Sequence, residues 1–119
     1  DLQDRVLVLQ SGAFAPVVRN ARGLITINST AGIAALEAGV PVFALGDAIY
    51  SHDSLASVHR SSADLDAFWN DPRPPDPAAT ASFVNHLKLH CLIPGSFYDA
   101  ETWADLARAV TAKLEAAAR

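Results

Sequence analysis

The chain has 119 residues, half of them apolar, and a net charge of −4 from nine lysines and arginines against thirteen aspartates and glutamates. This length suits one domain with a hydrophobic core, and the acidic balance excludes the basic surface by which proteins bind nucleic acid or anionic membranes. No apolar stretch reaches the roughly 20 residues of a membrane-spanning helix. A single cysteine, Cys91, excludes an internal disulfide and suits a reducing compartment. Because the chain lacks methionine and begins at Asp1, we interpret it as the carboxyl-terminal piece of a longer protein.

The first half of the chain has the pattern of alternating strands and helices. Apolar runs predict buried strands at 5–9, 24–28 and 40–45, and apolar residues at helical spacing predict helices at 13–21 and 30–38. Continuous apolar strands with short links are typical of a parallel sheet covered on both faces. We therefore expect an α/β fold, in which helices flank a Rossmann-like parallel sheet.

The second half is predicted to be helical after a polar loop. Residues 46–62 show no clear period and are expected to form a loop or a broken helix. Helices are predicted at 63–69 and 77–91, the second with Asp76 as N-cap, and a last helix is predicted with Asp99 as its N-cap. The side chains expected to face inward are Phe14, Val17, Val18 and Ala21 in the first helix of the chain, and Leu65, Phe68, Trp69, Phe83, Val84, Leu87, Cys91, Trp103, Leu106, Ala107, Val110 and Leu114 in these later helices.

The strongest candidate for a binding site is the polar turn made of Asn28, Ser29, Thr30, Ala31 and Gly32, which ends a predicted strand and opens a helix. Ser29 suits the N-cap, and free amides of residues 30–32 can bind a phosphate at the carboxyl edge of the sheet. The small side chains of Ala31 and Gly32 let a ligand approach the backbone. A serine-capped helix packed on the sheet explains the same pattern without a ligand. The turn matches neither a Walker loop nor the dinucleotide fingerprint.

Further polar residues follow the next predicted strand, and so belong to the same edge of the sheet. Asp47 can accept hydrogen bonds from sugar or base groups, and Tyr50 can stack on a ring; an exposed Gly46-Asp47 turn explains the pattern equally well. His52 and His59 lie in the loop beyond. A loop histidine is usually solvated, but as a cation it can pair with a phosphate.

His86 and His90 lie four residues apart on one predicted helix, beside Cys91, which is the spacing of a metal-binding pair. No third ligand has convincing spacing, so we predict no metal site and expect these residues to flank the buried stripe. The chain also contains no nucleophile elbow and no Ser-His-Asp arrangement. Catalytic residues are therefore unknown from the sequence.

Five blocks of the sequence follow one another in a recognisable order: residues 21–32 (ARGLITINSTAG), 35–42 (ALEAGVPV), 45–50 (LGDAIY), 65–69 (LDAFW) and 94–98 (PGSFY). Together they resemble the capsule polysaccharide synthesis and export proteins of Gram-negative bacteria. The resemblance covers nearly the whole chain and is carried by the order of the blocks, since the turn at 28–30 alone is a weak signal.

The resemblance implies a retaining glycosyltransferase that moves Kdo (3-deoxy-D-manno-oct-2-ulosonic acid) from CMP-Kdo to a lipid-linked acceptor during capsule synthesis. It implies a GT-B-like pair of Rossmann-type halves, with the nucleotide held mainly by the carboxyl-terminal half. This chain, residues 1–119, is then that single nucleotide-sugar-binding domain, with 63–119 as its helical part and the upstream half absent. The same resemblance implies no cofactor beyond the CMP-Kdo donor, and a cytoplasmic protein that meets its lipid acceptor at the inner membrane.

The resemblance also implies where the donor binds and where the chemistry occurs. The family's His-Pro motif and catalytic carboxylate belong to upstream segments and have no counterpart here, so this chain alone is expected to bind part of a donor and to catalyse nothing. The residues implied at the donor are Asn28, Ser29 and Thr30 at the CMP phosphate, Gly32 beside it, and His59, Gly95, Ser96 and Phe97 along the cleft.

Two other functions fit the same residues. A sugar-nucleotide epimerase also uses a small-residue helix start and two Rossmann-type halves. A non-catalytic module of a polysaccharide export assembly needs no ligand at the turn. The upstream sequence discriminates among the three, because transfer requires a second Rossmann-type half with the catalytic residues.

Overall fold

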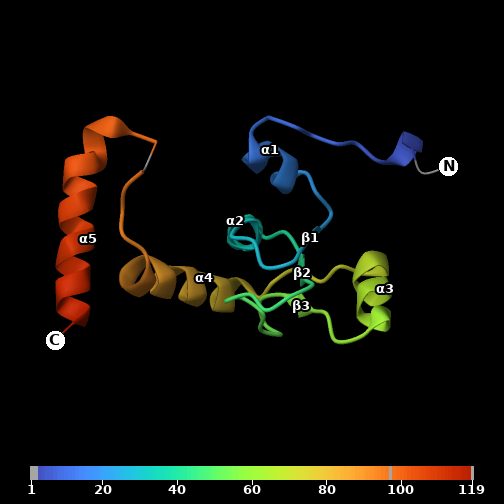
Figure 1. Ribbon diagram of the computed structural model, residues 1–119. Helices are drawn as coiled ribbons and strands as arrows, with labels where there is room; N and C mark the ends of the chain where they lie inside the picture. Colours follow the sequence, from blue (N-terminus) through green and yellow to red (C-terminus); the bar gives the residue numbers. More distant parts are fainter. Residues whose placement is uncertain (1–2, 97, 119) are drawn as a thin grey trace. The chain divides into compact units, whose positions relative to one another are not determined.

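A computed structural model describes residues 3–96 and 98–118 of the chain (Figure 1). The described residues fall into two compact units, and the boundary lies between Ala81 and Ser82. The first unit holds the sheet, and the second consists of helices and the segments that join them. Among the described residues, no helix combines the length and the apolar character that crossing a bilayer requires.

The first unit is built on a three-stranded parallel sheet in the order β1-β2-β3. Its strands are β1 (Leu24–Thr26), β2 (Val42–Ala44) and β3 (Ser57–Val58), and Phe43 pairs with Ile25 on one side and Ser57 on the other. All three residues of β2 are buried, so both faces of the sheet are covered there. The α/β class and the parallel sheet flanked by helices, as predicted, are confirmed.

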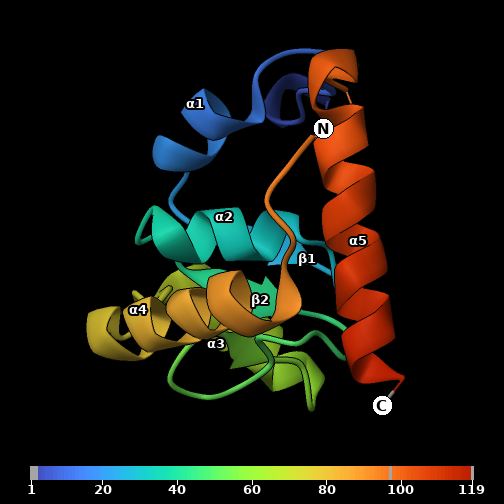
Figure 2. The same ribbon diagram turned by 90° about the vertical axis from the view of Figure 1, so that its left-hand side faces the viewer.

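Helix α2 (Ala31–Glu37) connects β1 to β2 and packs along both strands, and α1 (Phe14–Arg19) packs against α2 (Figure 1; Figure 2). Ala35 and Leu36 are almost fully buried. Gly39 follows α2 with a φ of 71°, a left-handed conformation that glycine adopts at little cost, and its amide donates to the Leu36 carbonyl at 2.9 Å. This abrupt stop lets the chain return directly to the sheet as β2.

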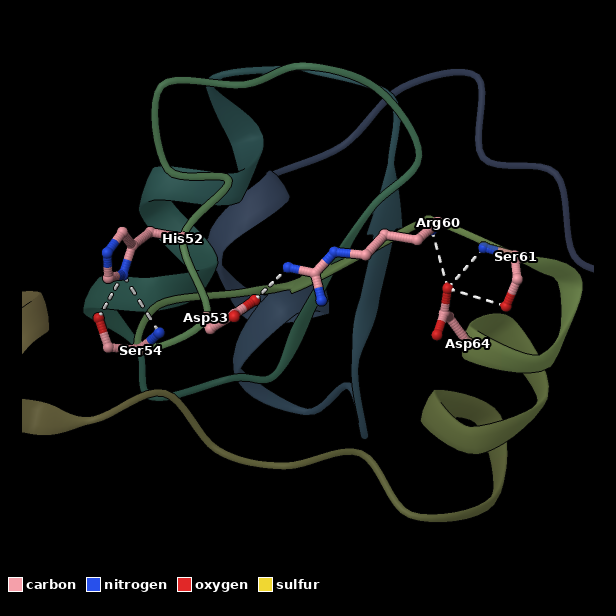
Figure 3. A network of polar contacts seen from close by, with 6 residues as sticks. All are labelled: His52, Asp53, Ser54, Arg60, Ser61 and Asp64. Atoms are coloured by element: carbon pink, nitrogen blue, oxygen red, sulfur yellow. Dashed lines mark hydrogen bonds and ion pairs between the residues drawn. The ribbon is translucent and has the colours of Figure 1, made fainter.

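Helix α3 (Ser62–Asn70) begins at a compact hydrogen-bond network (Figure 3). The Asp64 carboxylate accepts from the backbone amides of Arg60 and Ser61 at 2.8 and 2.6 Å, and from the Ser61 hydroxyl at 3.1 Å. The carboxylate thus satisfies amides that have no partner within the helix. Farther along α3, the ring of Phe68 lies 5.3 Å from that of Phe43, which joins this helix to the sheet.

This network predicts a pH dependence of stability. The backbone hydrogen bond from Arg60, followed by that from Ser61, lowers the pKa of the Asp64 carboxyl. Because the folded pKa lies below the unfolded one, near 4, the contribution to stability is present above about pH 4 and is lost as the pH falls through the folded pKa. We expect Asp64→Asn to lower the melting temperature at pH 7 and to have progressively less effect as the wild-type carboxyl is protonated.

Thermal unfolding of both proteins across that pH range measures this difference. Asp66→Asn is the matched control, because Asp66 lies on the same helix and its carboxylate forms no hydrogen bond to another described residue. The control is expected to show no such convergence with the wild type at low pH. An equal loss for Asp64→Asn at every pH would contradict the role of its charge.

Two predictions in the first unit are wrong about strands. Residues 5–9 were expected to form a buried strand, but the structure has a short 3-10 helix at Gln3–Arg5, and the side chains of residues 6–9 are 58–82% exposed. Within the described chain no strand pairs with this segment, and an apolar run without a neighbour cannot form a ladder. Conversely, β3 lies in the segment predicted as a loop. This strand forms because its backbone pairs with that of β2, and the side-chain pattern of a segment does not predict such a pairing.

The predicted helices of this unit are confirmed with slightly shifted ends, but the predicted burial of some of their side chains is wrong. Val18 and Phe68 are buried as expected, and Leu65 is half-buried. The short α1 packs on α2 through a narrow stripe, because a helix of six residues presents few side chains to a neighbour. The side chains predicted inward that are exposed are Phe14, Val17 and Trp69.

Helix α4 (Pro77–His86) contains the boundary between the units, continues as one π-helical turn (Leu87–Cys91), and is followed in the second unit by α5 (Trp103–Ala117). Both predicted caps are confirmed: Asp76 accepts from the Ala79 amide at 2.7 Å, and Asp99 accepts from the Glu101 amide at 3.2 Å. Val84, Leu87 and Leu106 are buried, Phe83 and Val110 are half-buried, and Cys91, Trp103, Ala107 and Leu114 are exposed against prediction. The wider π-helical turn rotates Cys91 off the helical stripe that the prediction assumed.

Candidate functional site

The three strands end at a common edge of the sheet, where parallel α/β proteins bind their ligands. Polar residues that follow β1 and β2 line one hollow there, with a volume of about 290 Å³. The NST turn (Asn28–Thr30) supplies Asn28 and Thr30, and the loop after β2 supplies Asp47 and Tyr50. The structure therefore brings together residues of two sequence blocks that were predicted separately. The remaining lining comes from Ile33, Ala48 and Ile49.

The amides of the NST turn are only partly free. The Ser29 hydroxyl accepts from the Ala31 amide at 3.2 Å, and the Ser29 carbonyl accepts from the Gly32 amide at 3.0 Å. The expectation that residues 30–32 all offer open amides is therefore wrong for two of them. The helix begins one residue later than predicted, with Thr30 at the N-cap position, because the first turn closes tightly on itself. The Thr30 amide forms no hydrogen bond to another described residue.

Tyr50 occupies the space beside Gly32. A Cβ atom at Gly32 would lie 2.3 Å from the Tyr50 Cζ atom, and the Tyr50 hydroxyl donates to the Ser29 carbonyl at 2.7 Å. The side chain is 1% exposed, and burial raises the pKa of its hydroxyl. Gly32 thus makes room for a tyrosine ring of the protein itself, whereas the sequence had suggested that it keeps the turn open for a ligand. The ring's contact with Gly32 leaves little of it to stack on a ligand.

The loop that carries Asp47 and Tyr50 is closed by its own hydrogen bonds. The Ser51 amide donates to the Ala48 carbonyl at 2.8 Å, the Ala48 amide donates to the Ser51 hydroxyl at 3.0 Å, and that hydroxyl donates to the Gly46 carbonyl at 3.3 Å. Asp47 itself is exposed, and its carboxylate forms no hydrogen bond to another described residue. The loop therefore holds Asp47 at the hollow with its acceptor atoms open to solvent.

The predicted histidines lie away from this hollow. His59 directly follows β3 at the same edge of the sheet, but it lies outside the lining, and its ring meets that of Phe43 edge-on with centroids 6.1 Å apart. His52 forms a hydrogen bond with Ser54, in which its Nδ1 atom lies 2.9 Å from the Ser54 hydroxyl (Figure 3). Neither ring therefore joins Asn28 or Asp47 in the geometry that the structure describes.

The other predicted pair, His86 and His90, has ring centroids 4.7 Å apart. In the described part of the chain, no three His, Cys, Asp or Glu side chains are grouped so as to hold a metal ion.

Sequence reasoning missed a second, larger hollow of about 670 Å³ beside β3. One wall carries an exposed ion pair between Arg60 and Asp53, 2.7 Å apart, next to the Asp64 network (Figure 3). No sequence motif predicts this hollow, because its residues come from β3 and the segments on either side of it, from α3 and from the proline-rich connector. Its charged lining residues are Asp53, Arg60, Asp64, Asp71 and Arg73.

The predicted residues of the PGSFY block belong to the second unit. Gly95 has a φ of 150°, and a Cβ atom there would lie 2.7 Å from a methyl carbon of Leu106, so a close approach to α5 requires glycine. Ser96 accepts from the Tyr98 amide at 3.2 Å. Phe97 lies outside the described residues. That these residues line the donor cleft remains a prediction.

Comparison with known proteins agrees with the resemblance seen in the sequence. The family described as "Capsule polysaccharide biosynthesis protein" matches residues 1–98. The capsule polysaccharide modification protein LipB of Neisseria meningitidis serogroup A is 32% identical over 99 residues, which cover 82% of this chain and 22% of LipB. The capsule polysaccharide export protein KpsS of Escherichia coli is 29% identical over 97 residues, and the protein FixF of Sinorhizobium fredii is 32% identical over 103.

The alignments cover most of this chain but only a small part of each relative. The same 82% of this chain aligns with 24% of KpsS and 25% of FixF, so the chain spans about a quarter of the length of the relatives it matches. No solved structure matches it significantly. The family match extends over more than four fifths of the chain and includes both blocks that line the hollow. The chain therefore belongs to the capsule polysaccharide biosynthesis family.

Proposed function

We propose that this chain is the donor-nucleotide-binding part of a glycosyltransferase that transfers Kdo from CMP-Kdo to a lipid-linked acceptor in capsule synthesis. We propose further that it forms the carboxyl-terminal half of a GT-B-like enzyme, with the catalytic residues in the remaining part of that enzyme. The family match and the names of LipB and KpsS, a modification and an export protein of capsule polysaccharide, support a role in this process.

One observation carries the nucleotide-binding proposal: Asn28, Thr30 and Asp47 line one hollow at the carboxyl edge of a parallel sheet, and each has a polar group that forms no hydrogen bond to another described residue. The side-chain amide of Asn28 and the backbone amide of Thr30 are donors that suit phosphate oxygens. The carboxylate of Asp47 accepts hydrogen bonds and suits the hydroxyls of a ribose or a sugar. Donors and an acceptor in the lining of one hollow match a nucleotide sugar, which has a phosphate next to hydroxyl groups.

The size of the hollow fits part of such a ligand. Its volume of about 290 Å³ lies at the lower end of the roughly 300–1,000 Å³ typical of small-molecule sites. It therefore suits the nucleoside monophosphate part of the donor, with the sugar extending toward the rest of the enzyme. During transfer, negative charge develops on the departing CMP. Each hydrogen bond from Asn28 or Thr30 to that phosphate would contribute about 1.5–3 kcal/mol.

Calorimetry of the full-length protein with CMP tests this proposal. We expect CMP to bind, and we expect Asn28→Ala and Asp47→Ala each to weaken binding about tenfold, because each removes one partner of the ligand. His52→Ala is the matched control, since His52 lies outside the hollow and is exposed. Absence of CMP binding, or equal losses in the control, would contradict the proposal.

A non-catalytic module of an export assembly is a second candidate, and the name of KpsS favours it. Such a module needs no nucleotide at the NST turn. The same calorimetry separates the two candidates, because only the transferase binds CMP through Asn28 and Asp47.

A further inference from the structure

Strand β1 lies at an edge of the sheet, and its outer side has no partner among the described residues. The Leu24 amide donates to the Pro41 carbonyl at 2.8 Å, so Leu24 faces β2. The Thr26 carbonyl accepts from the Leu45 amide at 2.8 Å, so Thr26 also faces β2. Because alternate residues of a strand direct their backbone groups to opposite sides, the N–H and C=O of Ile25 point away from β2. No described residue forms a hydrogen bond with either group.

The composition of β1 is that of an interior strand. The sequence from Leu24 to Ile27 is Leu-Ile-Thr-Ile, which contains none of the charged residues or prolines that protect exposed sheet edges. Such apolar strands in a parallel sheet are typically covered on both faces. All of β2 is buried, whereas no residue of β1 is, and Ile25 and Ile27 are exposed. The described chain therefore leaves β1 without the cover that its sequence suits.

The opposite edge of the sheet, at β3, is protected. The charged pair of Arg60 and Asp53 lies at the hollow beside this strand. Pro74 and Pro75 of the connector line the same hollow together with Val58. Charged side chains and a covering loop are among the ways in which natural sheets block an edge. The two edges therefore differ: β3 is closed to a further strand, and β1 is open to one.

The apolar run at residues 6–9 does not occupy the open edge. It belongs to the same unit as β1 and precedes it by one helix, α1, as the first strand of a βαβ unit would. The described sheet nevertheless has no strand next to β1 on its outer side, and all four side chains of the run are exposed. The strand that suits this edge is therefore not supplied by the described residues.

Proteins of this family have further chain from which such a strand can come. The part of this chain that aligns covers only 22% of LipB and 24% of KpsS. A segment of the same polypeptide is present at a high effective concentration, so its pairing does not require the encounter of two molecules. This favours the family's own additional chain over a second copy as the occupant.

We infer that the outer side of β1 is a docking surface for an apolar strand from the part of the full-length protein outside residues 1–119. That strand pairs its backbone with the N–H and C=O of Ile25, and its side chains cover those of Ile25 and Ile27. The sheet of this domain then continues beyond the described chain. The inference does not depend on nucleotide binding, because it concerns the edge of the sheet and not the hollow that holds Asp47.

Hydrogen exchange in the full-length protein, resolved to single amides, tests the pairing of Ile25. We expect the Ile25 amide to exchange within about tenfold of the rate of the Leu24 amide, which already has a partner in β2. The Val58 amide is the matched control, because it points away from β2 at the other edge, and it is expected to exchange at least about a hundredfold faster than Leu24. Exchange of Ile25 about a hundredfold faster than Leu24 overturns the inference.

Photo-cross-linking identifies the occupant of the edge. With p-benzoylphenylalanine incorporated in place of Ile25 in the full-length protein, we expect an intramolecular cross-link to an apolar peptide outside residues 1–119. The same group in place of the exposed Asp66 on α3 is the control, and it should not capture that peptide. A cross-link from position 25 to residues 5–9, or a product of twice the mass, overturns the inference, because the occupant would then be this chain's own run or a second copy.

The outcomes are independent of the proposed function. Absence of CMP binding would contradict the nucleotide site and leave the protection of Ile25 unchanged. Rapid exchange at Ile25 in a protein that binds CMP would overturn the docking surface alone.

Discussion

Ser29→Asp is expected to weaken CMP binding by roughly a hundredfold while the protein stays folded. Aspartate is a good residue for the start of a helix, so it can still accept from the Ala31 amide as the serine hydroxyl does. It also adds a negative charge beside the proposed phosphate. Two like charges about 5 Å apart in a surface environment repel by about 3 kcal/mol, which corresponds to a loss of roughly a hundredfold in affinity. Calorimetry of the full-length protein with CMP measures this loss of affinity.

The control for this charge is Ser29→Asn, which has nearly the same shape as aspartate without its charge. We expect its CMP affinity to stay within about threefold of the wild type. Added salt should restore part of the affinity of Ser29→Asp, because salt screens the repulsion. Unchanged CMP affinity in Ser29→Asp would dispose of a phosphate at the NST turn.

Gly32→Ala is expected to lower the free energy of unfolding by about 3 kcal/mol, near the upper end of the cost of overpacking a buried site. The added Cβ atom would meet the Tyr50 Cζ and Oη atoms at 2.3 and 2.4 Å, distances that no relaxed contact permits. The ring cannot move aside easily, since it is buried and its loop is closed by hydrogen bonds. Urea unfolding, followed through both the midpoint and the slope, measures the change.

A double variant shows whether the ring is the cause. Tyr50→Val alone creates a cavity, but with Gly32→Ala the new methyl group enters space that the ring has left. We therefore expect the double variant to lose less stability than the sum of the single ones, with a coupling of about 1 kcal/mol or more. Additive losses would show that the alanine clashes with something other than Tyr50.

Much of the local structure could be predicted from the sequence. The predicted starts of α3 and α4, and the capping role of Asp76, depend on residues within about four positions along the chain, and these predictions are confirmed within one residue. The parallel order of β1 and β2 follows from the helix between them. The order of the sequence blocks was sufficient to recognise the family, because it records the whole chain rather than one motif.

The strands and burial at the ends of elements could not be predicted in the same way. A strand exists only where a neighbour offers backbone groups, so the apolar run at 5–9 remains exposed and the polar β3 becomes a strand. Cys91 and Leu114 lie at apolar positions of their predicted helical stripes but are exposed, because burial requires a surface opposite them. The side-chain pattern of a segment indicates which local structure the segment prefers, but it does not show whether another segment lies against it.

The sequence alone determined the α/β class, the polar turn after β1 and the loop that carries Asp47 and Tyr50. Only the tertiary structure decided that these two segments line one hollow, and that Tyr50 rather than open space lies against Gly32. The physical reason is distance along the chain. Hydrogen bonds within a turn are set by adjacent residues, whereas the atom that fills the space over Gly32 belongs to a residue 18 positions later, brought there by the pairing of β1 with β2.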